Sequence, residues 1–205
     1  VGESNNLFPE IYELFSTGTA TLLSLTHLLN LKKGKQRLHL PSFFCLEIVP
    51  KLKEVFDIAW YRDLPTEEAP DFNSLNPCPG DLVLAVNFFG IRQGKAWQDW
   101  LSQHDDIILI EDHTHDPFCA WAQQSTAHYA MASLRKTLPI PDGAILWSPQ
   151  KMSLPKPTSP PPLGSYQKLS AMLLKRAYLR GVEIPKDAYR QLQIEGEQHL
   201  YTETD

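Results

Sequence analysis

Lys136 and Asp112 are the two residues whose types and positions could act together in chemistry. Asp112 ends the apolar run IILIED, which is typical of a central strand in a parallel sheet. Lys136 is the last residue of the segment SLRK, which begins with the final serine of a second apolar run, HYAMAS. A lysine amine can attack a carbonyl carbon, and a carboxylate can stabilise a positive charge. Open sheets of this class bind ligands at the carboxyl ends of their strands, so both residues are candidates for one site.

A polar turn, Ser16–Ala20, is the third candidate feature. It precedes the stretch TLLSLTHLLNL, whose apolar residues recur at helical spacing and predict an amphipathic helix: Leu22, Leu25, Leu28 and Leu29. The free N–H groups and the dipole at the start of a helix suit an anionic phosphate. Turns of this composition also cap helices without binding anything, so this turn indicates phosphate binding only together with other features.

The histidines beside Asp112 leave an alternative open. His113, His115 and Asp116 form an H-x-H-D cluster directly after the predicted strand. Imidazole and carboxylate groups are common ligands of divalent metals. The alternative function is therefore a metal-dependent hydrolase built on an α/β scaffold. No second ligand cluster follows downstream, so the pattern favours this reading less.

Strands alternating with helices must position these side chains. Helices are expected at 45–55, where Pro50 can restart the helix, and at 95–104, where Trp97, Trp100 and Leu101 share one face. This alternation predicts an α/β fold, a three-layer arrangement with a mostly parallel sheet. The FF pair, Phe88 and Phe89, is expected to pack within the sheet. The expected strands are 37–44, 56–62, 81–90, 107–112, 128–133 and 143–148.

The chain changes in composition at Ser148. Residues 1–148 are expected to form the main domain that carries the candidate site. Residues 149–164 are dense in proline and predict a linker, because proline is excluded from helix interiors and central strands. Residues 165–205 predict a helical segment, with a second helix after Pro185, and form the start of an incomplete second region.

Composition and charge exclude several classes of function. The net charge of -5 argues against a nucleic-acid binder, because no basic excess is present to neutralise phosphates. No apolar run is long enough to span a bilayer, and the given residues lead us to expect no secretory signal, since VGESNNLFPE has neither a basic start nor an apolar run. Three widely spaced cysteines form neither a disulfide framework nor a zinc pattern. Free thiols and a cytoplasmic setting are therefore expected.

Five segments together resemble a known family. GTATLLSL, LPSFFC, VNFFG, IEDHTHD and SLRKTLPIPDGAIL occur in the order seen in fold-type-I pyridoxal-phosphate (PLP) enzymes. The sequence is most similar to the sugar-aminotransferase-like group typified by DegT, DnrJ, EryC1 and StrS. The resemblance covers about Ser16 to Ser148, and the ordered set of motifs carries it. The serine and lysine of DegT-type motifs lie farther apart than in SLRK, which indicates a more distant branch.

The resemblance implies a role for each candidate residue. Lys136 would form a Schiff base with the cofactor and then move a proton between the substrate and the cofactor. Asp112 would pair with the pyridine nitrogen, and His115 would contact the phenolic oxygen. Phe43 or Phe44 would cover the ring, and Phe44 is included in the predicted site. The residues expected to hold the phosphate are Gly18, Thr19, Ala20 and Ser133.

The family further implies an aminotransferase that moves an amino group from an amino donor to a keto acceptor, a sugar or another small metabolite. A homodimer is expected, because enzymes of this fold usually place the active site between subunits. Family members are considerably longer, so the chain is expected to be an amino-terminal, large-domain portion. An alternative is a non-catalytic relative kept for assembly or regulation. The presence of both Asp112 and Lys136 argues against a non-catalytic relative, since a buried lysine amine is costly unless it reacts.

Overall fold

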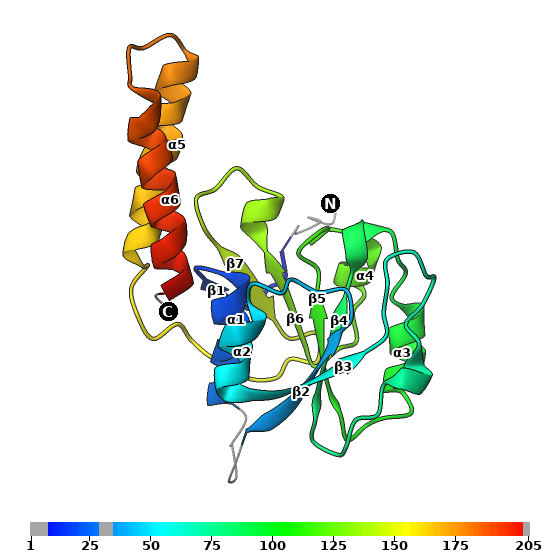
Figure 1. The fold of residues 1–205 in the computed structure, drawn as a ribbon. Coiled ribbons are helices and arrows are strands. Elements are labelled where there is room, and N and C mark those ends of the chain that lie inside the picture. Colours follow the sequence, from blue (N-terminus) through cyan, green and yellow to red (C-terminus); the bar gives the residue numbers. More distant parts are fainter. Residues whose placement is uncertain (1–7, 29–34, 203–205) are drawn as a thin grey trace.

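Seven short segments form one sheet in the computed structural model, which describes residues 8–28 and 35–202 (Figure 1). The strands are β1 (Tyr12–Phe15), β2 (Gln36–Pro41), β3 (Phe56–Tyr61), β4 (Leu82–Val86), β5 (Ile108–Asp112), β6 (Tyr129–Ser133) and β7 (Ala144–Trp147). Their order across the sheet is β1-β7-β6-β5-β4-β2-β3. Strands β2 to β6 are parallel, whereas β7 is antiparallel to both of its neighbours. The sheet is thus mostly parallel, as predicted.

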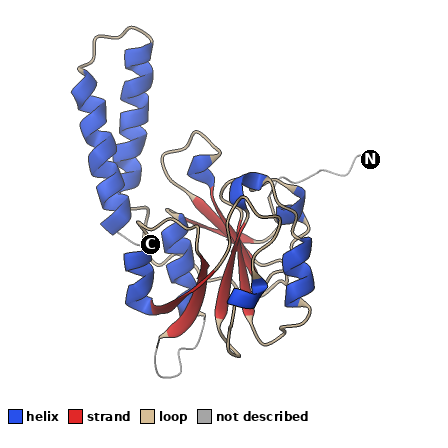
Figure 2. Cartoon of the chain, turned by 45° about the vertical axis from the view of Figure 1, so that its right-hand side comes forward, coloured by secondary structure: helices blue, strands red, loops and turns tan. Residues whose placement is uncertain are grey.

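Short helices cover both faces of this sheet (Figure 2). They are α1 (Gly18–Ser24), α2 (Val49–Val55), α3 (Lys95–Leu101) and α4 (Ala120–Gln123), with 3-10 turns η1 (Leu25–His27), η2 (Phe72–Ser74), η3 (Phe88–Gly90) and η4 (Leu134–Lys136). Apolar residues of α1 and α2 pack on one face of the sheet, and those of α3 and α4 pack on the other. The expected three-layer α/β fold is confirmed.

Strand β4 illustrates how the sequence builds these layers. Consecutive side chains of a strand point to opposite faces, so a strand covered on both sides must be apolar throughout. Leu82, Leu84 and Val86 belong to the cluster that includes α1 and α2. Val83 and Ala85 belong to the cluster around α3. All five residues are buried, which is why this part of the chain reads as an uninterrupted apolar run.

Most of the predicted helices and strands are present, but they begin and end at residues different from those predicted. Helix α2 begins at Val49 with Pro50 in its first turn, where proline is tolerated because no N–H is needed. Trp97, Trp100 and Leu101 of α3 are buried, as predicted. Leu29, expected on the first helix, lies outside the described residues.

Two elements were not predicted from the sequence. Strand β1 is a four-residue edge strand in which only Phe15 is buried, so it carries little alternation of apolar and polar residues. Helix α4 has only four residues, too few for a helical repeat to be visible. Both depend on tertiary contacts: β1 pairs with β7, and Trp121 of α4 joins the core.

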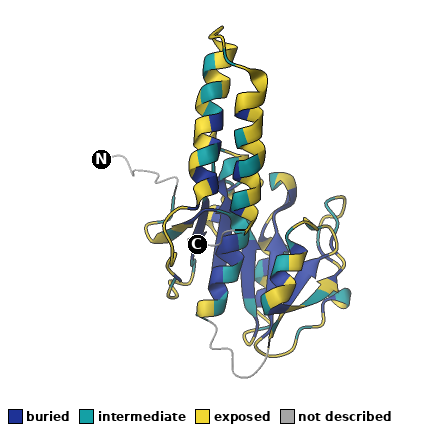
Figure 3. Cartoon of the chain, turned by 60° about the vertical axis from the view of Figure 1, so that its left-hand side comes forward, coloured by how far each residue is buried: buried dark blue, intermediate teal, exposed yellow. Residues whose placement is uncertain are grey.

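After β7 the chain runs to a helical hairpin, α5 (Leu163–Leu179) and α6 (Lys186–Thr202), that projects from the sheet domain (Figures 1 and 3). The two helices cross at two glycines. A Cβ on Gly164 would lie 2.4 Å from the carbonyl oxygen of Gly196, so no larger residue fits between the backbones. Several apolar side chains of α5 face solvent, including Leu169 and Leu173. No helix within residues 8–28 and 35–202 has the length and hydropathy needed to cross a membrane.

Candidate functional site

The carboxyl ends of the parallel strands bring the candidate residues to one edge of the sheet. Asp112 ends β5 and Ser133 ends the adjacent β6. Ala144 of β7 pairs with Ser133 on one side and with Phe15 on the other. The backbone N–H of Gly143 donates to the carbonyl of Ser16 at 2.8 Å. The predicted turn after β1 therefore lies beside the end of β6.

Gly18 occupies the tightest place in this arrangement. A Cβ on Gly18 would lie 3.1 Å from Cε of Met131 and 3.5 Å from Cβ of Ser133. The absence of a side chain thus lets the start of α1 approach Ser133 closely. Thr17 caps the helix, because its Oγ1 accepts from the N–H of Ala20 at 3.0 Å. Ala20 is buried, and its N–H is already bonded to this cap.

Thr114 connects Asp112 to Ser133. The N–H of Thr114 donates to Oδ1 of Asp112 at 2.8 Å, which forms a turn closed by the aspartate side chain. Oγ1 of Thr114 accepts from the N–H of Ser133 at 2.9 Å. These two bonds hold the Asp112 carboxylate at the end of its strand. Thr114 is not among the residues predicted for the site, although an aspartate two residues before a backbone N–H is a known signal for such a turn.

His115 lies on the surface of the loop after β5 and is bound to the turn η3. Its Nδ1 accepts from the N–H of Phe89 at 3.1 Å, and its ring stacks on the Phe89 ring with centroids 4.9 Å apart. Burial lowers the pKa of His115 and the charge of Lys136 lowers it further, whereas the charge of Asp112 and a hydrogen bond to the Asn87 backbone act in the opposite direction. A neutral ring that accepts at Nδ1 carries its proton on Nε2. Nε2 of His115 is therefore a hydrogen-bond donor.

Lys136 is the last residue of η4 and is exposed. The expectation that its amine is buried is wrong. The turn η4 carries the chain out of the sheet at its open edge, so only Leu134 of this turn is buried. The Lys136 amine is nevertheless close enough to His115 to influence its pKa, as is Asp112. The structure thus brings together the amine, the carboxylate and the imidazole at one end of the sheet.

The aromatic residues differ from the expectation for the FF pair. Phe88 is buried, but the Phe89 side chain is 55% exposed and does not pack within the sheet. Phe89 has φ of 54°, a left-handed conformation that is costly for a bulky residue. Phe43 contacts both rings, with centroids 5.5 Å from Phe88 and 6.3 Å from Phe89. Phe44 instead packs against the core beside α2.

Gly90, the residue after Phe89, approaches the loop after β5 closely. A Cβ on Gly90, which has φ of +70°, would lie 2.7 Å from Cβ of Asp116. The turn η3 is thus pressed against the loop after β5, and this contact presents Phe89 to His115. The glycine at the end of the VNFFG segment is the sequence signal for such a turn, and it was not predicted to form one.

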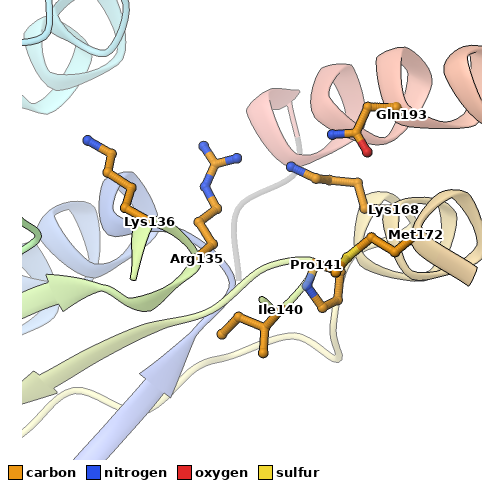
Figure 4. Close-up of a pocket in the computed structure, with 7 residues that line it drawn as sticks. All are labelled: Arg135, Lys136, Ile140, Pro141, Lys168, Met172 and Gln193. Atoms are coloured by element: carbon orange, nitrogen blue, oxygen red, sulfur yellow. The ribbon is translucent and has the colours of Figure 1, made fainter. Parts of the chain in front are cut away.

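A pocket of about 390 Å³ lies between η4 and the helical hairpin (Figure 4). Arg135 and Lys136 line it from η4, and Lys168 lines it from α5. Glu197 of α6 binds two of these cations: it accepts from Nη1 of Arg135 at 2.8 Å and forms an ion pair with Lys168. The remaining residues that line the pocket are Ile140, Pro141, Met172 and Gln193.

The three residues of the metal alternative do not form one site. His113 is fully buried and its Nε2 lies 2.9 Å from Oε2 of Glu111. His115 is exposed and stacks on Phe89, and Asp116 faces Gly90. Within the part of the chain that the structure describes, no three His, Cys, Asp or Glu side chains are arranged to hold a metal ion. The hydrolase alternative therefore has no structural support.

Comparisons with known proteins give structural matches only. No family model matches the sequence, and no curated protein is significantly similar to it in sequence. A serine palmitoyltransferase of Sphingomonas wittichii matches 93% of this chain with a TM-score of 0.52 and 14% identity, over 47% of its own length. A Streptococcus pneumoniae protein assigned as a sugar aminotransferase, in its PLP form, matches 68% with a TM-score of 0.52 and 12% identity, over 42% of its length. A sphingosine-1-phosphate lyase of Burkholderia pseudomallei matches 66% with a TM-score of 0.51 and 14% identity, over 37% of its length.

These matches establish the fold. The mostly parallel sheet with helices on both faces is shared with solved structures that include PLP-bound enzymes. The chain spans less than half the length of each of these three proteins.

Proposed function

We propose that this chain provides the cofactor-binding part of a PLP-dependent aminotransferase. The observation that carries the proposal is the position of Lys136 and Asp112 at the carboxyl edge of the sheet: Asp112 ends β5, and η4 with Lys136 directly follows the adjacent β6. His115 lies in the loop after β5, where the charges of both residues act on its pKa. The donor set fits the cofactor: an exposed amine can bond to its carbonyl carbon, and a carboxylate can pair with its ring nitrogen. The shared fold supports the proposal, because solved proteins with this fold carry PLP.

The bound cofactor would supply an electron-withdrawing ring that stabilises negative charge on a substrate carbon. Asp112 would keep the ring nitrogen protonated, and Thr114 holds this carboxylate in place through its N–H. His115 would donate from Nε2 to the phenolic oxygen, because its Nδ1 is already bonded to Phe89. Lys136 would bond to the cofactor and, once released, carry a proton to and from the substrate carbon.

Of the four residues predicted to hold the phosphate, Gly18, Thr19 and Ser133 are proposed for this role, and Ala20 only shapes the turn beside them. The start of α1 lies against Ser133, so the two segments can reach one anion. The N–H of Ala20 is bonded to Thr17, which leaves the N–H groups of Gly18 and Thr19 and the hydroxyls of Thr19 and Ser133 as donors. Of the two candidate aromatics, the proposal now favours Phe43 over Phe44 as the residue beside the ring, because Phe43 contacts the Phe89 that stacks on His115.

The proposal extends to amino transfer, cell location and assembly. An amino donor and a keto acceptor, a sugar or another small metabolite of the kind handled by the DegT group, would be the substrates. A cytoplasmic homodimer is proposed, with the active site completed by the second subunit. Sedimentation of the purified protein over a range of concentrations tests the dimer, and a monomer at all concentrations would contradict it.

Cofactor binding is tested by mixing the purified protein with PLP. Wild type is expected to gain a visible absorbance band and a yellow colour, and Lys136→Ala is expected to lose both. Reduction with sodium borohydride should fix the cofactor covalently on the peptide that contains Lys136, as located by mass spectrometry. Lys95→Ala is the matched control, because Lys95 is an exposed lysine on α3 that pairs with Asp99.

A colourless wild-type protein would contradict the proposed cofactor. A coloured protein labelled on a lysine other than Lys136 would contradict the assigned role of that residue. Amino transfer is tested separately, by adding an amino donor and following loss of the visible band. A band that persists with every donor tested would favour the non-catalytic relative over an aminotransferase.

A further inference from the structure

A buried ion pair at the carboxyl edge of the sheet has no role in the proposed function. Asp63 lies two residues after β3, and Arg92 lies two residues after the turn η3 that follows β4. Nη1 of Arg92 donates to Oδ1 of Asp63 at 2.6 Å, and the two side chains are 5% and 0% exposed. The pair therefore joins the segments that follow two strands of the sheet, β3 and β4.

The Arg92 guanidinium is bonded through all three of its nitrogens. Nε donates to the carbonyl of Glu67 at 3.1 Å, and Nη2 donates to the carbonyls of Leu64 and Glu67. These carbonyls belong to the same segment as Asp63, so one guanidinium holds residues 63–67 together. A lysine ammonium is a single point of charge and does not reproduce this planar set of donors.

Stability alone does not account for this pair. Oδ2 of Asp63 is buried and has no hydrogen-bond partner among the residues that the structure describes. Two charges are costly to remove from water, and apolar residues of similar volume often stabilise such a position equally well. A buried pair with an unsatisfied oxygen therefore points to a need for one fixed arrangement of the loops.

The segment after β2 passes between the two halves of the pair. β2 lies between β4 and β3 in the sheet and is parallel to both, so a bond from one neighbour to the other crosses its carboxyl end. There Oγ of Ser42 and the N–H of Phe43 both donate to the carbonyl of Asp63, at 3.1 and 3.3 Å. The N–H of Asp63 donates back to Oγ of Ser42 at 3.1 Å. The place of Asp63 thus fixes the backbone from which the Phe43 side chain extends.

Arg92 also supports the rings that Phe43 packs against. Its guanidinium carbon lies 5.1 Å from the centroid of the buried Phe88 ring. Phe43 packs edge-on against Phe88 and also contacts Phe89, which stacks on His115. One end of the ion pair therefore holds the backbone of Phe43, and the other end holds the ring beneath it.

We propose that Asp63 and Arg92 are positioning residues, whose ion pair holds the Phe43 ring against η3, where it covers the bound cofactor. This inference rests on the proposed function, because it assigns the placed ring to PLP. Neither residue touches the cofactor or the reacting atoms. Loss of the pair leaves Lys136 able to bond to PLP, but PLP is released faster because its ring loses a fixed aromatic neighbour.

The placement of the ring is tested in the cofactor-free protein. A double variant, Asp63→Val with Arg92→Met, replaces the pair by apolar side chains and leaves no unpaired buried charge. NMR of wild type should detect through-space contacts of the Phe43 ring with the rings of Phe88 and Phe89. The double variant should lose these contacts. It should keep the contact between Phe89 and His115, which has its own hydrogen bond.

The effect on the site is tested in the PLP-loaded protein. Wild type and the double variant should both become yellow and carry the borohydride label on Lys136. The double variant should release unreduced PLP about fivefold to tenfold faster on gel filtration, which is the size of one lost aromatic contact. It should also show weaker visible circular dichroism, because the cofactor is no longer held in one orientation.

Two further variants separate positioning from stability. Arg92→Lys keeps the charge beside Asp63 but loses the bonds to the carbonyls, so its PLP release should be faster than in wild type and slower than in the double variant. Asp81→Asn is the matched control, because Asp81 forms a buried pair with His39 at 2.9 Å and lies directly before β4, at the amino edge of the sheet. It should lower the unfolding free energy and leave the ring contacts and the PLP release unchanged.

The proposal is overturned if the double variant keeps the Phe43 contacts or releases PLP at the wild-type rate. It is also overturned if Asp81→Asn speeds release as much, since lost stability would then explain the effect. If the double variant does not fold, Arg92→Lys decides: release at the wild-type rate overturns the proposal. A colourless wild type would contradict the proposed function itself, and with it the cofactor role of Phe43, whatever the ring contacts show.

Discussion

At the scale of single residues, His115 links the other two members of the candidate site. The Lys136 charge lowers the pKa of His115 and the Asp112 charge raises it, with burial lowering it most. The N–H of Phe89 fixes which ring nitrogen carries the proton. A neutral histidine that donates from Nε2 is suited to a negatively polarised oxygen, whereas a cationic one would compete with Lys136 for the same charge. The electrostatics of the three residues are therefore coupled.

This coupling predicts opposite pKa changes in two variants of the cofactor-free protein. Lys136→Gln removes a positive charge and should raise the pKa of His115 toward its ordinary value. Asp112→Asn removes a negative charge, keeps the oxygen that accepts from Thr114, and should lower it. Histidine NMR titrations measure both shifts, with the signal assigned by His115→Gln. A change in the same direction in both variants, or none in either, would mean that the three groups are not adjacent.

At the scale of elements, the turn η3 holds the ring of Phe89 at the surface in a strained backbone conformation. Phe89 has a positive φ and an exposed side chain, and both are unfavourable for folding alone. Its neighbour Phe88 is buried in the core and stabilises the fold in the ordinary way. The two phenylalanines are adjacent in the sequence, but Phe88 packs in the core and Phe89 stacks on His115.

Substitution of each phenylalanine should separate these contributions. Phe89→Gly relieves the backbone strain and loses the ring contacts, so its unfolding free energy should stay within about 1 kcal/mol of wild type. Phe88→Ala empties a core position and should cost about 3–5 kcal/mol. Chemical denaturation measures both. Under the proposed function, Phe89→Gly should also weaken retention of PLP. A loss of stability in Phe89→Gly as large as in Phe88→Ala would contradict the assignment of strain to this turn.

At the scale of the whole molecule, the helical hairpin is tied to the edge of the sheet that carries the site. Glu197 on α6 accepts from Arg135 at 2.8 and 3.0 Å and also pairs with Lys168 of α5. Ser165 of α5 donates to Asp142, in the turn before β7. These contacts join residues before the proline-rich connection 149–162 to residues after it. They hold the hairpin beside the pocket that Lys136 lines (Figure 4). The position of the hairpin therefore depends on charge.

Acid should loosen the hairpin from the sheet domain. Burial would raise the pKa of Glu197, but Lys168 and Arg135 lower it below its ordinary value of 4.5. A carboxylate whose pKa is lowered in the folded state stabilises that state at pH values above its ordinary pKa. This stabilisation is lost as the pH falls through the lowered pKa of the folded state. Hydrogen exchange in α6 should therefore increase at acidic pH. Glu197→Gln should reproduce the increase at neutral pH.

The control for this prediction is Glu183→Gln, which removes an exposed carboxylate from the loop between the two helices. It should leave exchange in α6 unchanged. Limited proteolysis of the connection 149–162 provides a second measurement, with faster cleavage expected in Glu197→Gln. Equal exchange and equal cleavage in the two variants would mean that the ion pairs do not hold the hairpin.

The sequence by itself determined the class of fold and the strand-end positions of the main candidates. An apolar run such as that of β4 predicts a buried parallel strand, because a strand covered on both faces has no side chain that faces solvent. An acid at the end of such a run is placed at the ligand-binding edge of the sheet by topology alone. The order of the motifs pointed to the same fold that the structural matches establish.

Only the tertiary structure decided what each side chain faces. Asp112 and Glu111 are neighbours in the sequence, yet they point to opposite faces, and the same loop sends His115 to the surface and His113 to the interior. The expected burial of Lys136 was wrong because η4 leaves the sheet at that residue. Burial, ring contacts and charge coupling arise between segments far apart in the chain, such as η3 and the loop after β5, and local patterns do not encode such contacts.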